Sequence, residues 1–524
     1  MTGGMSTVVS RAPVGLAAPL VRVEVHLGCG LPAFALVGLP ETVVRESRER
    51  VRSAILNSGY EFPSGRITVN LSPADLPKEG GRFDLPIAVG ILAASGQLPA
   101  RAAAGCELYG ELALSGELRR TNQLLPALIA GARTEHQLIV PAANDWEASW
   151  VAGPQVKVAR HLREVCEALR GGAHLRPAGA IEHAPARARL DISQVRGQFT
   201  AKRALEIAAA GSHAMLMIGP PGAGKTLLAQ CLPGLLPPLD EREALEVASL
   251  ASAAGQRLGA GLERPGLERP FRSPQHTASI AAVVGGSSLR PGELSLAHHG
   301  VLFLDELPEF SRNVLEALRE PLESGVVVVG RARRTCEYPA GFQLIAAMNP
   351  CPCGYAGESS GRCRCTPGEV ARYRRRLSGP LIDRIDMHVE LAQVPVEYLM
   401  AGSDAPDEFS RVSVESSAAI AARVAAARRV QMARQGVLNA RLDPAQIGGV
   451  CRLDRESRAL VAAAIDRLGF SARAYHRVLK LARTCADLVA EPQIRRSDIS
   501  EAIGLRTLDR APQGTERYLA SETM

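Results

Sequence analysis

One octapeptide limits the folds open to this chain more than any other segment: Gly219-Pro220-Pro221-Gly222-Ala223-Gly224-Lys225-Thr226. An apolar run precedes it and another follows, so the pattern predicts a glycine-rich loop between a strand and a helix. Backbone N–H groups of such a loop hold phosphates, and the helix dipole assists them. Lys225, one of only five lysines in the chain, would reach the terminal phosphates, and Thr226 would coordinate Mg²⁺. The sequence therefore predicts a nucleoside triphosphate site, and a chance glycine-rich turn explains neither flanking element.

An acidic pair follows a second apolar strand. Residues 301–304 predict a strand buried on both faces, and Asp305 and Glu306 come directly after it. Ligands bind at the carboxyl edge of a parallel sheet, so we expect Asp305 to hold Mg²⁺ and Glu306 to polarise the attacking water. Asn349 follows the apolar run 342–348 and is suited to hydrogen-bond that water or the γ-phosphate. Solvated acids at the end of a strand are a common alternative, but the presence of Asn349 after a further apolar run favours hydrolysis.

Length and composition set broad limits. A chain of 524 residues is too long for one core and predicts two or three domains. The net charge of +7 permits binding to nucleic acid without requiring it. Eleven cysteines, an odd number in a large chain of this kind, indicate a reducing compartment without disulfides.

The N-terminus does not predict export. Residues 2–21 lack a basic start, Arg11 interrupts them, and residues 21–27 continue as an alternating strand. Elsewhere no apolar run approaches the roughly 20 residues of a membrane span. We therefore expect a soluble cytoplasmic protein without a membrane partner.

Composition and periodicity divide the chain into five parts. Residues 1–170 carry strands and helices, and residues 171–190 are rich in Gly, Ala, Pro and Arg, as in a linker. Residues 191–395 alternate strand and helix, which predicts a three-layer α/β core. Residues 396–512 show mainly helical spacing and residues 513–524 form a tail without a clear pattern.

With these elements in place, the chain resembles the AAA+ ATPases, and among them the magnesium-chelatase-like family of the ComM and YifB type. The resemblance covers nearly the whole chain. It is carried by the segments Gly38–Glu41, Arg66–Leu76, Phe271–Thr277, Leu304–Phe310 and Asn349–Gly354. Gln275 stands where the family usually has a second histidine. The resemblance implies a Lon-protease-like N-terminal domain of the S5-type α+β class, an AAA+ P-loop core and a C-terminal helical lid.

The family also implies that a neighbouring subunit completes each site. Arg384 lies in a segment, residues 378–386, that resembles the family's arginine finger, and Arg473 resembles its sensor-2 arginine. An ion pair of Arg384 with Asp383 or Asp386, and a solvated Arg473, are the alternatives. If both arginines act between subunits, the chain forms a homo-oligomeric ring, which the family suggests is a hexamer.

A basic hairpin is predicted between the Asp305 and Asn349 strands. Residues 326–338 read as two strands around Arg331, Arg333 and Arg334. In helicase-like AAA+ proteins such a hairpin projects into the ring pore, where these arginines would contact DNA phosphates. A solvated charged turn is the competing interpretation. Residues 277–299 resemble a second pore insertion.

Four cysteines lie close together after Asn349: Cys351, Cys353, Cys363 and Cys365. Four thiols suit a tetrahedral zinc site, although the C-x-C spacing is tighter than the usual C-x₂-C. Reduced cysteines without a metal remain the alternative.

The resemblance to the Lon protease domain does not extend to its chemistry. Proteolysis there would need a serine nucleophile and a lysine base. This chain has Asp84 and Leu125 near those positions, so the domain is expected to be catalytically inactive.

The resemblance implies an ATP-driven DNA motor with ATP and Mg²⁺ as cofactors. The family's branch-migration helicase acts on single-stranded or branched DNA during natural transformation and homologous recombination. The alternatives are a metal-chelatase motor subunit that drives Mg²⁺ insertion, and a relative of the ATP-dependent proteases.

Overall fold

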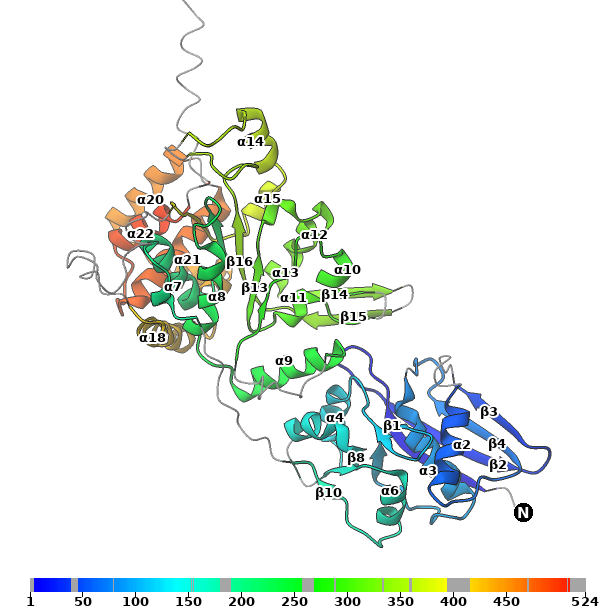
Figure 1. The fold of residues 1–524 in the computed structure, drawn as a ribbon. Coiled ribbons are helices and arrows are strands. Elements are labelled where there is room, and N and C mark those ends of the chain that lie inside the picture. The colour runs from blue at the N-terminus through cyan, green and yellow to red at the C-terminus, as the bar shows by residue number, and fades with distance from the viewer. Residues whose placement is uncertain are drawn as a thin grey trace, which may run out of the picture.

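The structure is a computed structural model of the chain. It describes residues 4–508 except for 39–45, 79, 152, 154, 180–189, 257–267, 287–288, 332–333, 358–360, 394–414, 469–470 and 507. Two bodies are visible in Figure 1, an N-terminal unit and a larger unit that carries the P-loop, and helix α9 (Glu241–Ala253) lies between them.

An eight-stranded mixed sheet organises the N-terminal unit. Its strand order is β10-β9-β8-β5-β1-β2-β4-β3. In chain order the strands are β1 (Met5–Arg11), β2 (Leu20–Gly28), β3 (Ala33–Val37), β4 (Arg66–Ser72), β5 (Cys106–Leu108), β8 (Gln137–Pro141), β9 (Val156–Ala159) and β10 (Arg176–Pro177). A short hairpin, β6 (Glu111–Leu112) and β7 (Leu118–Arg119), stands apart from this sheet.

The helices of this unit cover the sheet through apolar faces. Val21, Val23 and Val25 alternate along β2 and are fully buried, as the two-residue period of a strand requires. Helix α3 (Asp84–Ala94) is buried on nearly every side and packs on β1 and β2. The other helices are α2 (Ser47–Asn57), α4 (Leu125–Gly131), α5 (Asp145–Ala148) and α6 (Leu162–Leu169).

A five-stranded parallel sheet forms the centre of the larger unit. Its order is β12-β13-β16-β11-β17. The strands are β11 (Met215–Ile218), β12 (Phe271–Arg272), β13 (Val301–Leu304), β16 (Gln343–Met348) and β17 (Met387–Glu390). Because all five run in one direction, the segments that follow them meet at one edge of the sheet.

Alternate residues of these strands enter two separate cores. Met215, Met217 and Phe303 pack in one cluster, whereas Leu216, Leu302 and Leu304 pack in another. Both faces of the sheet are therefore covered, which confirms the α/β class and the parallel sheet expected from the sequence. Besides α9, the helices of this unit before its C-terminal segment are α7 (Phe199–Gly211), α8 (Lys225–Leu235), α10 (Ile280–Val283), α11 (Glu293–Leu296), α12 (Arg312–Ala317), α13 (Arg319–Ser324), α14 (Pro367–Arg374) and α15 (Gly379–Ile382).

The C-terminal segment is helical. It comprises α18 (Ser417–Gln435), α19 (Pro444–Val450), α20 (Arg455–Leu468), α21 (Ala472–Leu488) and α22 (Arg496–Gly504). Helix α18 packs on α7 and α8, and its buried residues share one core with the sheet. This C-terminal helical unit therefore lies directly over the helix that comes after the P-loop (Figure 1).

The predicted hairpin is present between β13 and β16. Strands β14 (Val326–Arg331) and β15 (Arg334–Pro339) are antiparallel, with Arg331 opposite Arg334. They extend away from the parallel sheet in Figure 1. Arg333 lies outside the described residues, as do the side chains of Arg331 and Arg334.

Helix α9 joins the two units through hydrogen bonds as well as packing. The Gln123 amide donates to the carbonyl of Ala253 at 2.9 Å, and the Ser252 hydroxyl donates to Glu147 at 2.8 Å. A second contact is made by Val14 and Leu16, which pack against the core that includes the hairpin residue Tyr338. Among the helices in the described ranges, none has the length and apolar character that a membrane crossing requires.

Candidate active site

The glycine-rich loop has the backbone that its sequence predicts. It connects β11 to α8, and Gly222 and Gly224 have φ values of +79° and +89°, in the left-handed region that favours glycine. A Cβ at either position would meet nothing within 4 Å, so this face of the loop is open. The loop can therefore present backbone N–H groups to a phosphate.

Lys225 connects the loop to Asn349. Its ammonium group donates to the carbonyls of Gly219 at 2.5 Å and Pro220 at 3.0 Å, and to Oδ1 of Asn349 at 3.0 Å. Burial lowers the pKa of Lys225, and the opposing effect of Asp305 and Glu306 is smaller. Two residues predicted separately from the sequence are thus in direct contact.

The acidic pair lies on the other side of the loop. Thr226 Oγ1 donates to Oδ2 of Asp305 at 2.9 Å, which places a hydroxyl and a carboxylate where one Mg²⁺ would bind both. Glu306 comes next with a left-handed backbone, φ +51°. The ends of β11, β13 and β16 therefore bring together Lys225, Thr226, Asp305, Glu306 and Asn349.

A contact of His276 is not predicted by the sequence. Its Nδ1 lies 3.1 Å from Oε2 of Glu306, and both side chains are about half exposed. His276 belongs to the segment Phe271–Thr277, a motif to which the sequence assigns no role. The signal that could have found it is the position of this segment, because it continues from β12 at the same edge of the sheet.

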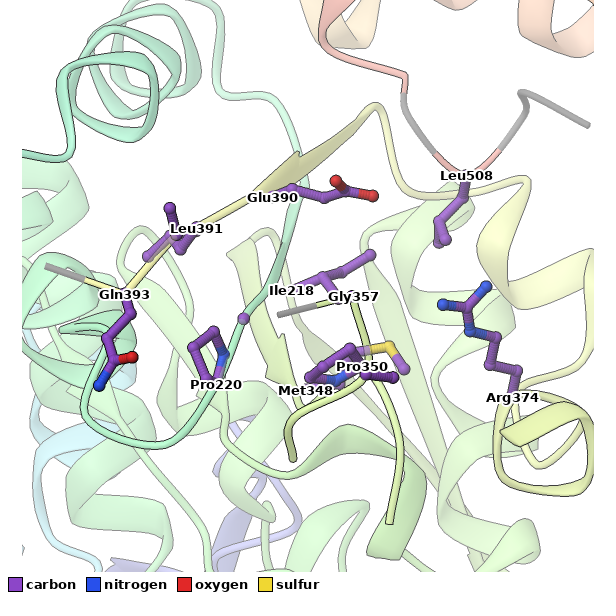
Figure 2. A pocket seen from close by; sticks show the side chains of 13 residues that line it. Ile218, Pro220, Met348, Pro350, Gly357, Arg374, Glu390, Leu391, Gln393 and Leu508 are labelled. Carbon is purple, nitrogen blue, oxygen red and sulfur yellow. The ribbon is translucent and has the colours of Figure 1, made fainter. Parts of the chain in front are cut away.

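A cavity of about 590 Å³ adjoins the loop (Figure 2). Pro220, Met348 and Pro350 line it, as do Glu390, the last residue of β17, and Leu391, which follows it. It is lined by Gly219 and Pro220 but not by Lys225, Thr226 or Asp305. The cavity therefore adjoins the predicted phosphate site and shares Gly219 and Pro220 with it.

Comparisons with known proteins match nearly the whole length of the chain. Three family profiles match consecutive parts: "Subunit ChlI of Mg-chelatase" residues 23–144, "Magnesium chelatase, subunit ChlI" residues 191–399, and "Magnesium chelatase, subunit ChlI C-terminal" residues 414–506. The competence protein ComM of Haemophilus influenzae is 46% identical over 97% of this chain and 99% of its own length. The chain belongs to the ComM and YifB family of magnesium-chelatase-like proteins.

Other relatives place this family beside the chelatase subunits. YifB of Escherichia coli is 47% identical over 97% of this chain and 98% of its own length. The magnesium-chelatase 67 kDa subunit of Heliobacterium mobile is 28% identical over only 38% of this chain and 31% of its own length. The chain therefore aligns with ComM and YifB over 97% of its length and with this chelatase subunit over 38%.

Arg384 has partners within its own chain. Nη2 lies 2.8 Å from Oε1 of Glu323, and Nη1 donates to the carbonyl of Pro380 at 2.8 Å. Nε has no hydrogen-bond partner in the part of the chain that the structure describes. Neither Asp383 nor Asp386, the partners considered from the sequence, forms these contacts. The partners belong to α13 and α15 and not to the P-loop.

Arg473 is exposed near the start of α21, and the same helix is fixed to the sheet one turn later. There Arg477 forms an ion pair with Asp386, which directly precedes β17. Burial by itself would raise the pKa of Asp386, but Arg477 and His213 hold it below its ordinary value. This ionic contact connects the C-terminal helical unit to the edge of the parallel sheet.

Asp84 and Leu125 have structural roles in the N-terminal unit. The Asp84 carboxylate accepts hydrogen bonds from Arg50 at 2.8 and 3.1 Å. Burial raises the pKa of Asp84 to about 6 despite the lowering effect of Arg50. Leu125 starts α4, and its N–H donates to Ser252 on α9 at 3.3 Å. Asp84 therefore forms an ion pair within the N-terminal unit, and Leu125 takes part in the contact between the two units.

Proposed function

We propose that this chain is an ATP hydrolase that uses Mg²⁺. The observation that carries the proposal is the contact of the P-loop residues Lys225 and Thr226 with Asn349 and Asp305, which come after two other strands. The matched magnesium-chelatase subunit family is AAA+ ATPase-like, which also supports this assignment.

Each side chain has one role in the proposed reaction. The loop 219–224 binds the phosphates through its N–H groups, and Lys225 neutralises the β- and γ-phosphates. Thr226 and Asp305 hold Mg²⁺, which supplies charge stabilisation when bound. Glu306 polarises the attacking water, and Asn349 orients the water or the γ-phosphate.

We propose that arginines stabilise the remaining negative charge on the phosphoryl group when the ring is assembled. Arg384 is the proposed finger, supplied to the P-loop of a neighbouring copy, and Arg473 is the proposed sensor. In this chain Arg384 is paired with Glu323; the Arg384 side chain is 12% exposed and that of Glu323 is 54% exposed. As a finger, Arg384 would exchange Glu323 for a phosphate of the neighbouring copy. A hexamer is the proposed state.

The proposed work of the ring is movement of DNA. Arg331, Arg333 and Arg334 of the hairpin would contact the backbone of a strand in the pore. Similarity to the competence protein ComM over 97% of the chain supports a role in natural transformation, and branch migration is the activity that we propose for it. On this account residues 1–170 form a Lon-like inactive domain, 171–190 a linker, 191–395 the motor and 396–512 its lid, in a cytoplasmic protein.

Two other functions have less support. The chelatase subunits are 28% and 25% identical over 38% and 30% of the chain, whereas ComM is 46% identical over 97% of it, so a Mg²⁺-inserting motor has less support. An ATP-dependent protease would need a nucleophile and a base where the chain has Asp84 and Leu125.

ATPase activity measured without DNA and with single-stranded, double-stranded and branched DNA tests the proposal. We expect branched or single-stranded DNA to stimulate turnover, Lys225→Ala to abolish it, and Arg333→Ala to lose only the stimulation. Arg496→Ala, an exposed arginine on α22, is the matched control. The DNA-motor proposal would be contradicted if none of these DNAs changed the rate of ATP turnover and the protein did not migrate a four-way junction.

A further inference from the structure

Four thiols converge beside Asn349. The Sγ atom of Cys351 lies 3.3 Å from that of Cys353 and 3.8 Å from that of Cys363, and the last two are 3.6 Å apart. With Cys365, all four sulfur atoms lie within 4.8 Å of one another. A tetrahedron of Zn–S bonds of about 2.3 Å has edges of about 3.8 Å. The observed separations therefore fit one metal ion with four thiolates.

Local backbone geometry makes the tight C-x-C spacing compatible with this arrangement. Gly354 comes directly after one pair with φ +89° and lies in a turn, and Gly361 lies two residues before the other pair with φ +66°, so left-handed backbone adjoins both pairs. The N–H of Ala356 donates to the Cys351 sulfur at 3.3 Å. Hydrogen bonds of this kind orient metal-bound ligands.

The charge around the cluster also suits thiolates. Arg362 and Arg364 flank Cys363, and Arg364 is also next to Cys365. These arginines add positive charge next to the cysteines in the sequence, which offsets part of the net negative charge that four thiolates and one divalent ion carry. The sulfur separations are much longer than the roughly 2.05 Å of a disulfide.

We propose that these four cysteines bind one structural zinc ion, and that the ion positions Asn349 for ATP hydrolysis. Four protein thiolates leave no open coordination position, as expected of a structural site and not of a catalytic one. Iron in place of zinc would satisfy the same geometry and is distinguished by the test below.

The route from the ion to the active site is short. Cys351 is two residues after Asn349, and it is fully buried. A Cβ on Gly354 would lie 2.7 Å from Cδ of Pro221 in the P-loop, so the backbone of this turn is in direct contact with the loop. The turn leads on to Ala356 and Gly357, which line the neighbouring cavity. Fixing the cysteines therefore fixes the segment that presents Asn349 to Lys225.

The positioning role rests on the proposed ATPase function, whereas zinc binding does not. Loss of the ion should impair hydrolysis more than binding, because the P-loop N–H groups and Lys225 bind nucleotide by themselves. We expect kcat to fall by about 10-fold or more, up to the roughly 10²- to 10³-fold seen when one transition-state hydrogen bond is lost. The Kd for a fluorescent ADP analogue should change much less.

Metal analysis of the full-length protein, purified without chelator, is the first test, and we expect about one zinc per chain. Cys363→Ser/Cys365→Ser should lose the zinc and the turnover, and Cys29→Ser, at an exposed cysteine, should keep both. On an Asn349→Ala background the double serine change should add little further loss, because both act through one residue. If the double variant fails to fold, releasing zinc from the wild type and restoring it should remove and recover turnover.

Three results would overturn parts of the inference separately. Wild-type protein with no metal, or with stoichiometric iron, would refute the zinc site. Zinc that is bound but can be removed without loss of kcat would refute the positioning role. Zinc bound to a protein that hydrolyses no ATP under any condition would leave the site intact and refute the proposed function.

Discussion

Glu306 differs from the other acidic residues of the site in its backbone. Its φ of +51° is uncommon for a residue other than glycine and costs of order 1 kcal/mol or more. Strain of this kind persists where the surrounding fold fixes it, and it is concentrated at functional sites. The Glu306 carboxylate lies beside His276, whereas its neighbour Asp305 contacts Thr226. The two adjacent acids therefore have separate positions for separate roles.

Glu306→Gln should reduce ATP turnover by about 10²- to 10⁴-fold, the usual contribution of a general base. The amide keeps the size of the side chain, so nucleotide affinity should remain within a few-fold of wild type. Steady-state ATPase and equilibrium binding of an ATP analogue separate the two effects. Glu309→Gln, whose carboxylate pairs with Arg376, is the matched control. Equal loss in both variants would assign Glu306 to folding and not to catalysis.

At the scale of elements, the contact between α9 and the segment before β13 depends on two neighbouring histidines. Nε2 of His298 and of His299 lie 3.2 and 2.7 Å from Oε2 of Glu246 on α9. Nδ1 of His298 accepts the N–H of Gly341 at 2.9 Å, so its proton is on Nε2 and points to Glu246. A metal ion would need the lone pair of that same Nε2. The cluster is therefore a hydrogen-bonded joint between elements.

This joint makes stability depend on pH. Burial and the charge of His299 lower the pKa of His298 to about 4, against a smaller raising effect of Glu246. An unfolded histidine has a pKa of about 6.5. Between these values the unfolded chain binds more protons, so the contribution of His298 is present above about pH 6.5 and is lost as the pH falls towards 4.

Thermal or denaturant unfolding at pH 7, 6 and 5 measures this effect. His298→Gln should be less stable at pH 7 and should show a weaker loss between pH 6.5 and 4, by up to about 1.4 kcal/mol per pH unit. His174→Gln, at an exposed position, should follow the wild type. Parallel pH profiles for the wild type and His298→Gln would show that another group controls the acid response.

At the scale of the whole molecule, the sequence predicted that the candidate site residues lie close together. Lys225, Asp305 and Asn349 come after apolar runs, and parallel strands place the residues at their carboxyl ends along one edge of the sheet. Their meeting was therefore implied by the strand assignments alone. The α/β class and the helical C-terminal segment were predictable for a similar reason, because both follow from the length and periodicity of apolar runs in the sequence.

Contacts between segments far apart in the chain were not predictable in this way. The pairing of Arg384 with Glu323 depends on how α13 and α15 pack, and no local pattern encodes that distance. The approach of His276 to Glu306 depends on the path after β12. The approach of the four thiols is accompanied by left-handed backbone at Gly354 and Gly361, which the sequence does not reveal. The packing of α4 on α9 likewise rests on surfaces with no sequence signature.

The central claim is that copies of this chain complete one another's active sites, and mixing two inactive variants tests it most directly. The Lys225→Ala variant has a defective P-loop but can still supply Arg384 to a neighbouring copy. The Arg384→Ala variant lacks the arginine but has an intact P-loop. Each variant should lose about 10³-fold or more of the turnover by itself, and an equimolar mixture assayed with branched DNA should regain a substantial part of it. If Arg384→Ala is fully active by itself, or if the mixture is no more active than its components, the shared site does not exist.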